Sequence, residues 1–258
     1  MNLAGKTSVI TGATSGLGRE IAIELAKRNS NLLVIGQNPQ KLENLTVELK
    51  KLGAGQITAR AINFSDRSSV EEHCKDASLA FPSFDYVFCS AGVKFEGPCR
   101  EISLSKLEDM MSVNYFSTVI LIKALVSKIA KGGHVFIVSS GAANFGIFND
   151  SGYCSSKAAL ERYAEALHSE LDSDGIRVTT VSPGPMETGM FREAVDYNGR
   201  KSTYTAGKAA DPRTRALQMI NHIGKGKFRL DLSINAPMGR ILATFAPSIL
   251  DGLVKRKK

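Results

Sequence analysis

Tyr153 and Lys157, with Ser140 thirteen residues upstream at the end of an apolar strand, have the residue types and spacing for proton transfer. Tyr153 and Lys157 lie four positions apart in Ser151-Gly-Tyr-Cys-Ser-Ser-Lys157, and residues at that spacing share one face of a helix. An ammonium about 4 Å from a phenolate stabilises it by up to ~4 kcal/mol at an effective dielectric of about 20. Since one pKa unit corresponds to ~1.36 kcal/mol, the pair predicts a Tyr153 pKa about two to three units below its usual value. A phenol tuned in this way is a general acid near neutral pH.

A glycine-rich turn, Thr11-Gly-Ala-Thr-Ser-Gly-Leu-Gly18, follows the first apolar run of the chain and leads into a helix marked by Leu17, Ile21 and Leu25. At such a junction Gly12 allows a tight exit from the strand, Gly16 lets backbone N–H groups approach a pyrophosphate, and Gly18 permits close helix packing. The helix N-terminus adds a favourable field for negative charge. The turn therefore predicts a dinucleotide site.

These residues would be positioned by an α/β fold, because short apolar runs rich in Val, Ile and Phe alternate with stretches of helical period. This pattern predicts a Rossmann-type, doubly wound parallel sheet of six or seven strands, with helices on both faces. The expected strands are Thr7–Thr11, Asn31–Gly36, Gln56–Asn63, Asp85–Ser90, His134–Ser139, Arg177–Ser182 and, as the seventh, Lys227–Leu232. The helices between them bury apolar stripes at Leu17, Ile21, Leu25, then Leu42, Leu45, Leu49, and finally Leu160, Ala164, Leu167 and Leu171.

One domain spanning residues 1–258 is expected, since the chain has no internal repeat and no low-complexity linker. The exception to its regularity is Met186–Lys208, which lacks clear periodicity. It ends near Asp211-Pro212, an N-cap with proline at the first helical position. Because long irregular segments in compact domains are often functional, residues 186–227 are predicted to cover the substrate; a variable surface loop is the alternative.

Bulk properties exclude several classes of function. The net charge is +8 over 258 residues, but Lys255-Arg-Lys-Lys258 supplies half of it, and without a nucleic-acid-binding module we expect no nucleic-acid partner. The four cysteines and four histidines have no zinc-site spacing, so no metal is expected and the thiols should be reduced. The first residues lack a signal-peptide h-region, which predicts a cytoplasmic protein.

The combination of Thr-Gly-x-x-x-Gly-x-Gly with Ser and Tyr-x-x-x-Lys resembles the short-chain dehydrogenase/reductase family, and the resemblance covers nearly the whole chain. Further matches are Ala91-Gly92, Asn114 in Ser-Val-Asn-Tyr, the strand end Ile137-Val-Ser-Ser140, and Pro183-Gly184 followed by Thr188. The resemblance implies that Tyr153 is the proton donor and that Ser140 orients the carbonyl. It also implies that Lys157 activates Tyr153 and binds the cofactor ribose, and that Asn114 holds a relay water.

The cofactor contacts expected from the turn, the strand ends and the resemblance are Gly12, Thr14, Ser15, Gly16, Leu17, Gly18, Gln37, Lys41, Asn63, Ala91, Gly92, Tyr153, Lys157, Pro183, Gly184 and Thr188. Two positions depart from the family pattern. Cys89-Ser-Ala-Gly92 replaces Asn-Asn-Ala-Gly, so a sheet-stabilising role passes to Ser90. Asn63 stands where an aspartate commonly contacts adenine, and it can both accept and donate hydrogen bonds.

The second strand indicates which cofactor is bound. An NAD enzyme of this type places an acid at the strand end to bind the ribose 2′-hydroxyl, but Val34-Ile-Gly-Gln-Asn38 is neutral there. Lys41, Thr14 and Ser15 could instead contact a 2′-phosphate. The pattern therefore favours NADP(H) over NAD(H). The alternative for Lys41 is that it is only a solvated residue of the helix.

The C-terminal segment, residues 234–258, repeats apolar residues at helical spacing and ends in the basic tail. The repeat consists of Ile241, Leu242, Phe245, Ile249, Leu250 and Leu253, interrupted by Pro247. Two interpretations stay open: short helices that close over the core or over a partner in a homodimer, or peripheral contact with anionic lipid. The glycine-rich oligomerisation segment of many family members is missing, which puts the common tetramer in doubt.

Phe136-Ile-Val-Ser-Ser140, Gly146-Ile-Phe148 and Tyr153-Cys-Ser-Ser-Lys157 also resemble, more weakly, the 3-ketosphinganine reductase and lipid-ketone branch. We therefore expect an NADP-dependent oxidoreductase that reduces a hydrophobic ketone of 3-ketosphinganine or 3-oxoacyl type. The alternatives are an NAD-dependent dehydrogenase of small carbonyl compounds and alcohols, and a dinucleotide-binding sensor without turnover. Nucleotide-sugar epimerisation would need a larger C-terminal substrate domain.

Overall fold

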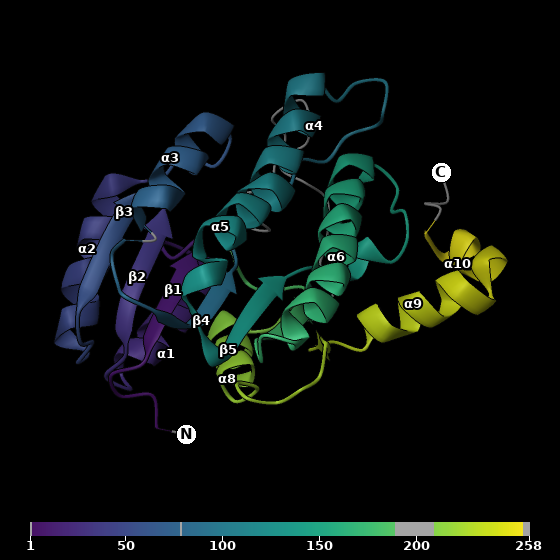
Figure 1. Cartoon of the computed structure of the whole chain (residues 1–258). Coiled ribbons are helices and arrows are strands. Elements are labelled where there is room, and N and C mark those ends of the chain that lie inside the picture. Colours follow the sequence, from purple (N-terminus) through teal and green to yellow (C-terminus); the bar gives the residue numbers. More distant parts are fainter. Residues whose placement is uncertain (1, 78, 189–208, 255–258) are drawn as a thin grey trace.

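A central sheet with helices on both faces forms the protein (Figure 1), and the computed structural model describes residues 2–77, 79–188 and 209–254. Seven parallel strands follow the order β3-β2-β1-β4-β5-β6-β7. They are β1 (Thr7–Thr11), β2 (Asn31–Gly36), β3 (Ile57–Ala61), β4 (Phe84–Cys89), β5 (Ile129–Val138), β6 (Arg177–Ser182) and β7 (Arg229–Asp231). The predicted fold class and the seventh strand are confirmed.

Three strands, β1, β2 and β6, have the predicted bounds, whereas β5 begins well before His134, at Ile129. Its register against β4 shifts between Phe84 and Tyr86, and Gly132 adopts a φ of 84°. The glycine pair at 132 and 133 resembles a turn in the sequence, but here it accompanies a bulge that bends the strand without ending it. The strands β3 and β7 are shorter than predicted, and β4 lies slightly earlier.

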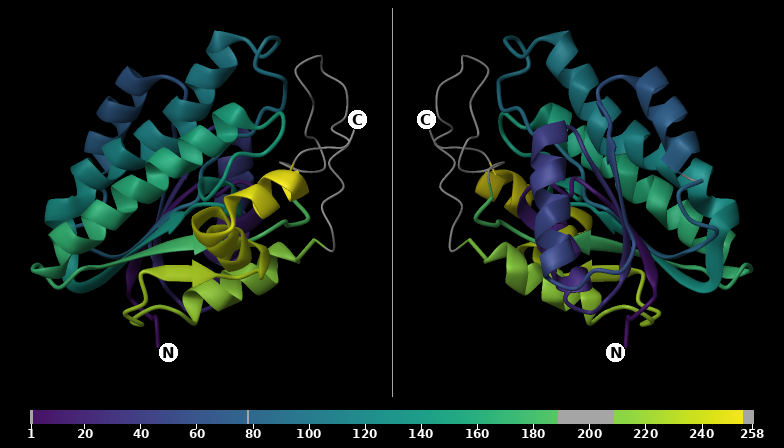
Figure 2. Two further views of the ribbon diagram at one scale, coloured as in Figure 1. Left: turned by 90° about the vertical axis from the view of Figure 1, so that its right-hand side faces the viewer. Right: turned by 90° about the vertical axis from the view of Figure 1, so that its left-hand side faces the viewer.

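The alternation of side chains along the strands divides the core into two apolar layers. Val9, Leu33 and Val135 pack on the face covered by α3 (Arg67–Ala77), α5 (Ser117–Leu125) and α6 (Ser151–Asp172). Ile10 and Phe136 pack on the opposite face, covered by α1 (Gly16–Ala26), α2 (Pro39–Lys51) and α8 (Pro212–Ile220). Figure 2 shows the two helix layers on either side of the sheet. The predicted stripes of α1, α2 and α6 are all buried.

The strand order reverses between β1 and β4, and such a reversal creates a crevice beyond the carboxyl ends of the strands. Gly12 follows β1 and Ser90 follows β4, so both stand at this crevice. The switch point thus brings the glycine-rich turn next to Ala91 and Gly92.

Before α5, the chain forms α4 (Leu104–Met111) and a π-helical turn at Ser112–Phe116. The continuous helical stretch Leu104–Lys128 is long and apolar enough to span a membrane, but half of its most apolar window is buried in the protein. Leu121, Ile122 and Leu125 of this stretch belong to the core, so we interpret it as a core helix.

The C-terminal segment forms two helices, α9 (Asn235–Phe245) and α10 (Pro247–Val254), which extend away from the sheet in Figure 1. The predicted interruption is confirmed, because Pro247 begins α10. The predicted cap is also confirmed, because the Asp211 carboxylate accepts from the N–H groups of Arg213 and Thr214. The basic tail, and residues 189–208 of the predicted substrate-covering segment, lie outside the described residues.

Candidate active site

Ser140 and Tyr153 meet beyond the carboxyl end of β5, where the Ser140 hydroxyl is near enough to the Tyr153 hydroxyl to lower its pKa. The backbone N–H of Ala142 donates to Ser140 Oγ over 3.2 Å, which leaves the Ser140 proton free to point at Tyr153. Tyr153 lies in the first turn of α6 and is only 8% exposed. Two hydroxyl groups therefore lie close together at one point. This is the arrangement that stabilises a carbonyl oxygen as it gains negative charge.

Lys157 lies one turn further along α6 and is 3% exposed. Its ammonium donates to the carbonyl oxygen of Val138 at 2.9 Å and is 5.9 Å from the centre of the Tyr153 ring. The helical spacing thus places the pair on one face, as predicted, and anchors the lysine to the end of β5.

The predicted lowering of the Tyr153 pKa is wrong for this structure. Burial raises the pKa of Tyr153 above its usual value, while the hydrogen bond with Ser140 and the ammonium of Lys94 oppose that rise. Burial also lowers the pKa of Lys157 to about 8, against the attraction of the Glu161 carboxylate. Desolvation disfavours the charged form of both groups, and the helix spacing carries no information about it. At neutral pH Tyr153 therefore holds its proton, which is the state that a proton donor needs.

Asn114 connects three segments around the site from within the π-helical turn. Its Oδ1 accepts from the N–H of Val93 at 2.8 Å, and its Nδ2 donates to the Val93 carbonyl at 3.0 Å and to Ser156 Oγ at 2.9 Å. Ser156 in turn donates to the carbonyl oxygen of Tyr153. The Asn114 side chain is fully used in fixing the loop after β4 and the start of α6, so its part in a proton relay stays a prediction.

The glycine-rich turn fits the close approach of a phosphate group. Gly12 and Gly16 have φ values of 66° and 52°, and a Cβ on Gly12 would lie 3.0 Å from the Ala91 backbone. A Cβ on Gly18 would overlap the Gly12 carbonyl, which agrees with its predicted packing role. Among the described residues no side chain caps α1 at Ser15, so the first N–H groups of α1, including that of Leu17, remain open to an anion.

Ser90 performs the bridging role expected of it. Its hydroxyl donates to the Thr11 carbonyl at 2.7 Å, and the N–H groups of Ser90 and Ala91 donate to Thr11 Oγ1 at 3.0 and 3.1 Å. These bonds tie β1 to β4 at the switch point and hold Ala91-Gly92 beside Gly12.

The remaining predicted cofactor residues surround the same crevice. Gln37 donates to Asn63 Oδ1 at 3.4 Å, and a Cβ on Gly36 would overlap the Thr14 methyl group. Lys41 is exposed in the first turn of α2. On the other side of the crevice, beyond β6, Pro183 precedes Gly184, and the methyl group of Thr188 faces Gly16. The predicted cofactor residues that follow β2 and those that follow β6 thus lie on either side of the N-terminus of α1.

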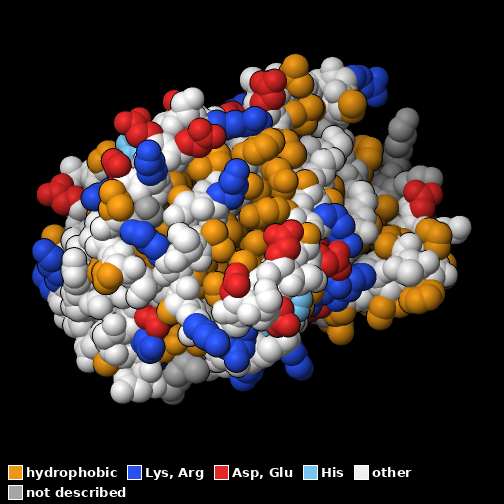
Figure 3. Space-filling model, viewed as in Figure 1, with side chains coloured by type: hydrophobic (Ala, Val, Ile, Leu, Met, Phe, Trp, Pro, Cys, Tyr) orange, Lys and Arg blue, Asp and Glu red, His pale blue; other side chains and the backbone are white. Residues whose placement is uncertain are grey.

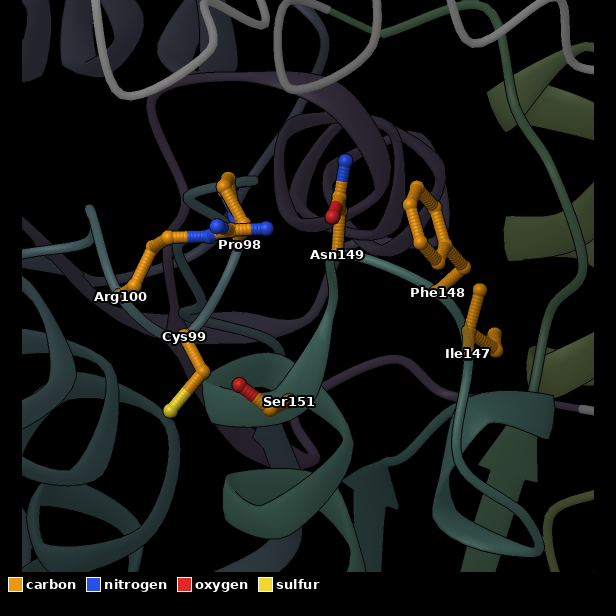
Figure 4. A pocket seen from close by; sticks show the side chains of 8 residues that line it. Pro98, Cys99, Arg100, Ile147, Phe148, Asn149 and Ser151 are labelled. Atoms are coloured by element: carbon orange, nitrogen blue, oxygen red, sulfur yellow. The ribbon is translucent and has the colours of Figure 1, made fainter. Parts of the chain in front are cut away.

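A hollow of about 470 Å³ lies beside the start of α6, between the loop after β4 and the loop before α6. Its lining comprises Gly97, Pro98, Cys99, Arg100, Ile147, Phe148, Asn149 and Ser151. Figure 4 shows Ile147 and Phe148 on one side of Asn149, with Pro98 and Arg100 on the other. The hollow offers mostly apolar surface close to the helix turn that carries Tyr153.

Sequence reasoning missed four residues around the site: Thr11, Ser156, Lys94 and Asp150. Thr11 and Ser156 lie within the quoted motifs, but ordinary serines and threonines give no signal of the bonds they form. Lys94 and Asp150 form an ion pair of 2.8 Å between distant segments, and the sequence pattern does not show that these segments meet.

Comparison with known proteins places this geometry in a family. The family model for short chain dehydrogenase matches residues 6–199. The chain belongs to the short-chain dehydrogenase family. It is 32% identical over 237 residues to the zebrafish (Danio rerio) protein "Dehydrogenase/reductase SDR family member 7B", covering 88% of this chain and 76% of that one. It is 29% identical over 262 residues to bovine (Bos taurus) "3-ketodihydrosphingosine reductase", covering 97% and 79%.

Among solved structures, a short-chain dehydrogenase from Streptomyces avermitilis has a TM-score of 0.80 at 23% identity, with 97% of this chain and 95% of that one covered. Membership of the family makes this protein an oxidoreductase that acts on alcohol or ketone groups and binds a nicotinamide cofactor. The open first turn of α1 is what such a cofactor requires. The missing Cβ at Gly12 lets the turn that leads into α1 lie close against the Ala91 backbone.

Proposed function

We propose that the protein reduces a hydrophobic, lipid-like ketone with NADPH and that Tyr153 donates the proton. The observation that carries the proposal is the meeting of the Ser140 and Tyr153 hydroxyls beside the buried ammonium of Lys157. A bound nicotinamide supplies the hydride. As the carbonyl oxygen gains negative charge, Ser140 donates a hydrogen bond to it and Tyr153 transfers its proton. Lys157, held by Val138, favours the phenolate that remains and binds the cofactor ribose.

The apolar character of the substrate is supported by the surfaces near Tyr153. The hollow beside α6 includes Ile147 and Phe148, and α9 packs with Ala236 against Gly141, next to Ser140. The likeness to a bovine 3-ketodihydrosphingosine reductase agrees with a long-chain ketone. An NAD-dependent dehydrogenase of small carbonyl compounds and a non-catalytic sensor are the competing functions.

A panel of ketones tests this proposal. The purified protein should oxidise NADPH with 3-ketosphinganine or 3-oxoacyl compounds, with kcat/KM rising as the chain lengthens, because each buried methylene adds ~0.8 kcal/mol of apolar transfer. Activity confined to small polar ketones or sugars would contradict the proposed substrate class.

The preference for NADP rests on the neutral end of β2. Gln37 stands where an NAD enzyme needs an acid, and exposed Lys41 is available to a 2′-phosphate. Thr14, in the glycine-rich turn, lies beside Gly36 at the end of β2. Arg19, another cation near the glycine-rich turn, forms an ion pair with Glu48 at 2.6 Å.

Changing Gln37→Asp should therefore lower the ratio of kcat/KM for NADPH over NADH by about tenfold or more. Two like charges ~4 Å apart repel by about 1–4 kcal/mol in a solvated site, and the new carboxylate can accept from the ribose 2′-hydroxyl of NADH. The matched control is Gln56→Asp, which makes the same change just before β3 begins. Gln56 lies at the amino ends of the parallel strands, away from the crevice at their carboxyl ends. Unchanged selectivity in Gln37→Asp would show that this position does not determine the preference for NADPH over NADH.

We also propose that α9 and α10 contact an anionic membrane surface that holds the substrate. Six large apolar side chains are exposed there: Ile234, Met238, Ile241, Phe245, Ile249 and Leu253, with Phe245 at 82%. Figure 3 shows apolar side chains along this projecting edge. The basic residues Lys255–Lys258 follow directly in the sequence, and basic residues at an anionic surface contribute ~1 kcal/mol each.

A flotation assay with vesicles checks this contact. The protein should float with vesicles that contain anionic lipid and lose at least about half of that binding in Ile241→Ser/Phe245→Ser, since each buried apolar side chain contributes ~1.5–3 kcal/mol. Leu104→Ser, which removes another exposed leucine from α4, should bind like the wild type. The outcome that would contradict membrane contact is a wild-type protein that does not float with vesicles and forms dimers. If Ile241→Ser/Phe245→Ser dissociated those dimers, the exposed face would belong to an interface with a second copy.

A further inference from the structure

Two buried charged groups outside the residues assigned above lie against Tyr153. Lys94 follows Gly92 in the loop after β4, and Asp150 immediately precedes α6. Their side chains are 5% and 4% exposed, and Lys94 Nζ is 2.8 Å from both Asp150 Oδ2 and Glu96 Oε1. The same ammonium lies 5.5 Å from the centre of the Tyr153 ring. Tyr153 therefore lies near two ammonium groups, those of Lys94 and Lys157.

This cluster has features that a purely structural ion pair does not need. Burying two charges costs several kcal/mol per ion, so such pairs often contribute little to stability. Asp150 keeps its second oxygen, Oδ1, buried without a hydrogen-bond partner in the described part of the chain, and Asp150 makes no side-chain cap to α6. A buried acceptor left unpaired at this position calls for an explanation beyond packing.

We propose that Lys94, held by Asp150 and Glu96, is a positioning residue that stabilises the Tyr153 phenolate formed when the proton leaves. The inference rests on the proposed role of Tyr153. A cation within about 4–6 Å favours a charged phenolate by one to three pKa units. Asp150 opposes this effect, but its influence on Tyr153 is smaller than that of Lys94.

The charged and titratable groups around Tyr153 agree with this assignment. Burial raises the pKa of Tyr153, Ser140 and then Lys94 lower it, and Asp150 and Cys154 raise it. Burial acts on Lys94 too, but Asp150 and Glu96 outweigh it and raise the pKa of Lys94, so the ammonium stays charged. Lys157, whose pKa burial lowers to about 8, is the less persistent of the two cations. Lys94 thus adds a second positive charge beside Tyr153, where the helix spacing had indicated that of Lys157 alone.

The test is a titration of Tyr153 that does not depend on turnover. The ultraviolet absorbance of phenolate is recorded against pH for wild type and Lys94→Met, each minus the corresponding Tyr153→Phe protein, so that Tyr153 alone is read. Lys94→Met should raise the Tyr153 pKa by about one unit or more. Lys94→Arg, which keeps the charge, should restore most of the difference. Lys106→Met removes an exposed lysine of α4 and should leave the titration unchanged.

The double variant Lys94→Met/Asp150→Asn keeps the experiment decisive if Lys94→Met alone folds poorly, because it leaves no uncompensated carboxylate at position 150. Its Tyr153 should still titrate above that of the wild type, because the influence of Lys94 on Tyr153 exceeds that of Asp150. In alcohol oxidation, where the phenolate is the base, the rise of kcat/KM with pH should move upward by the same amount. A Tyr153 pKa unchanged in both Lys94→Met and Lys94→Met/Asp150→Asn would overturn the inference. A shifted pKa together with no turnover in the wild type would instead refute the proposed function.

Discussion

Tyr153→Phe is expected to lower kcat/KM for ketone reduction by about 10²–10⁴-fold, the usual contribution of a general acid, while the dissociation constant for NADPH changes little. The substitution removes one hydroxyl from a buried ring and leaves Lys157 bonded to Val138. Steady-state kinetics and fluorescence titration of NADPH provide the two measurements. Phenylalanine cannot donate the proton, but it fills nearly the same volume in α6.

Tyr163→Phe is the matched control, because Tyr163 lies on the same helix and packs against Tyr115 within the core cluster, away from Ser140. Because Tyr163 does not touch the reacting groups, Tyr163→Phe should keep kcat/KM within about twofold of the wild type, a change of less than ~1 kcal/mol in the activation free energy. Equal loss in both variants would mean that the hydroxyl of Tyr153 acts through helix stability. An active Tyr153→Phe protein would remove the tyrosine from the mechanism.

Gly12→Ala is expected to weaken NADPH binding by about a hundredfold or more. The new methyl group would lie 3.0 Å from the Ala91 backbone, at a φ of 66° that L-residues other than glycine rarely adopt. The turn would have to move, and the first N–H groups of α1 would move with it. Calorimetric titration with NADPH measures the loss of affinity, and thermal unfolding reports the accompanying loss of stability.

Gly5→Ala separates strain from function. Gly5 has a similar φ of 71°, but a Cβ there would meet no atom within 4 Å. Both variants should therefore lose about 1 kcal/mol of stability from the left-handed conformation, and only Gly12→Ala should lose cofactor affinity. If Gly5→Ala weakened NADPH binding as strongly, the effect would be one of global stability.

The sequence predicted most of the features that depend on local periodicity. The stripes of α1, α2 and α6, the bounds of β1, β2 and β6, and the Asp211 cap follow from side-chain alternation and capping chemistry, and all are present. The extension of β5 back to Ile129, through a bulge, was not predicted. Gly132 and Gly133 are adjacent glycines, and by sequence alone such a pair indicates a turn.

The electrostatics of the site could not be predicted in the same way. The pKa of Tyr153 depends on burial by surrounding segments and on Lys94, which comes from the loop after another strand. The spacing of Tyr153 and Lys157 indicates that they are neighbours on α6, but it indicates neither their desolvation nor the Val138 carbonyl that binds Lys157. Similarly, the pattern Ser-Val-Asn-Tyr locates Asn114 without revealing the bonds to Val93 and Ser156.

The most direct test of the central claim is the fate of hydride in a reaction with a long-chain 3-keto compound and NADPH deuterated at the transferable position. The account predicts that mass spectrometry finds one deuterium on the carbinol carbon of the alcohol product, and that Tyr153→Phe binds the cofactor without forming this product. Tight NADPH binding with no deuterated alcohol from any ketone in the panel would contradict it, and would leave a dinucleotide-binding protein without this catalysis.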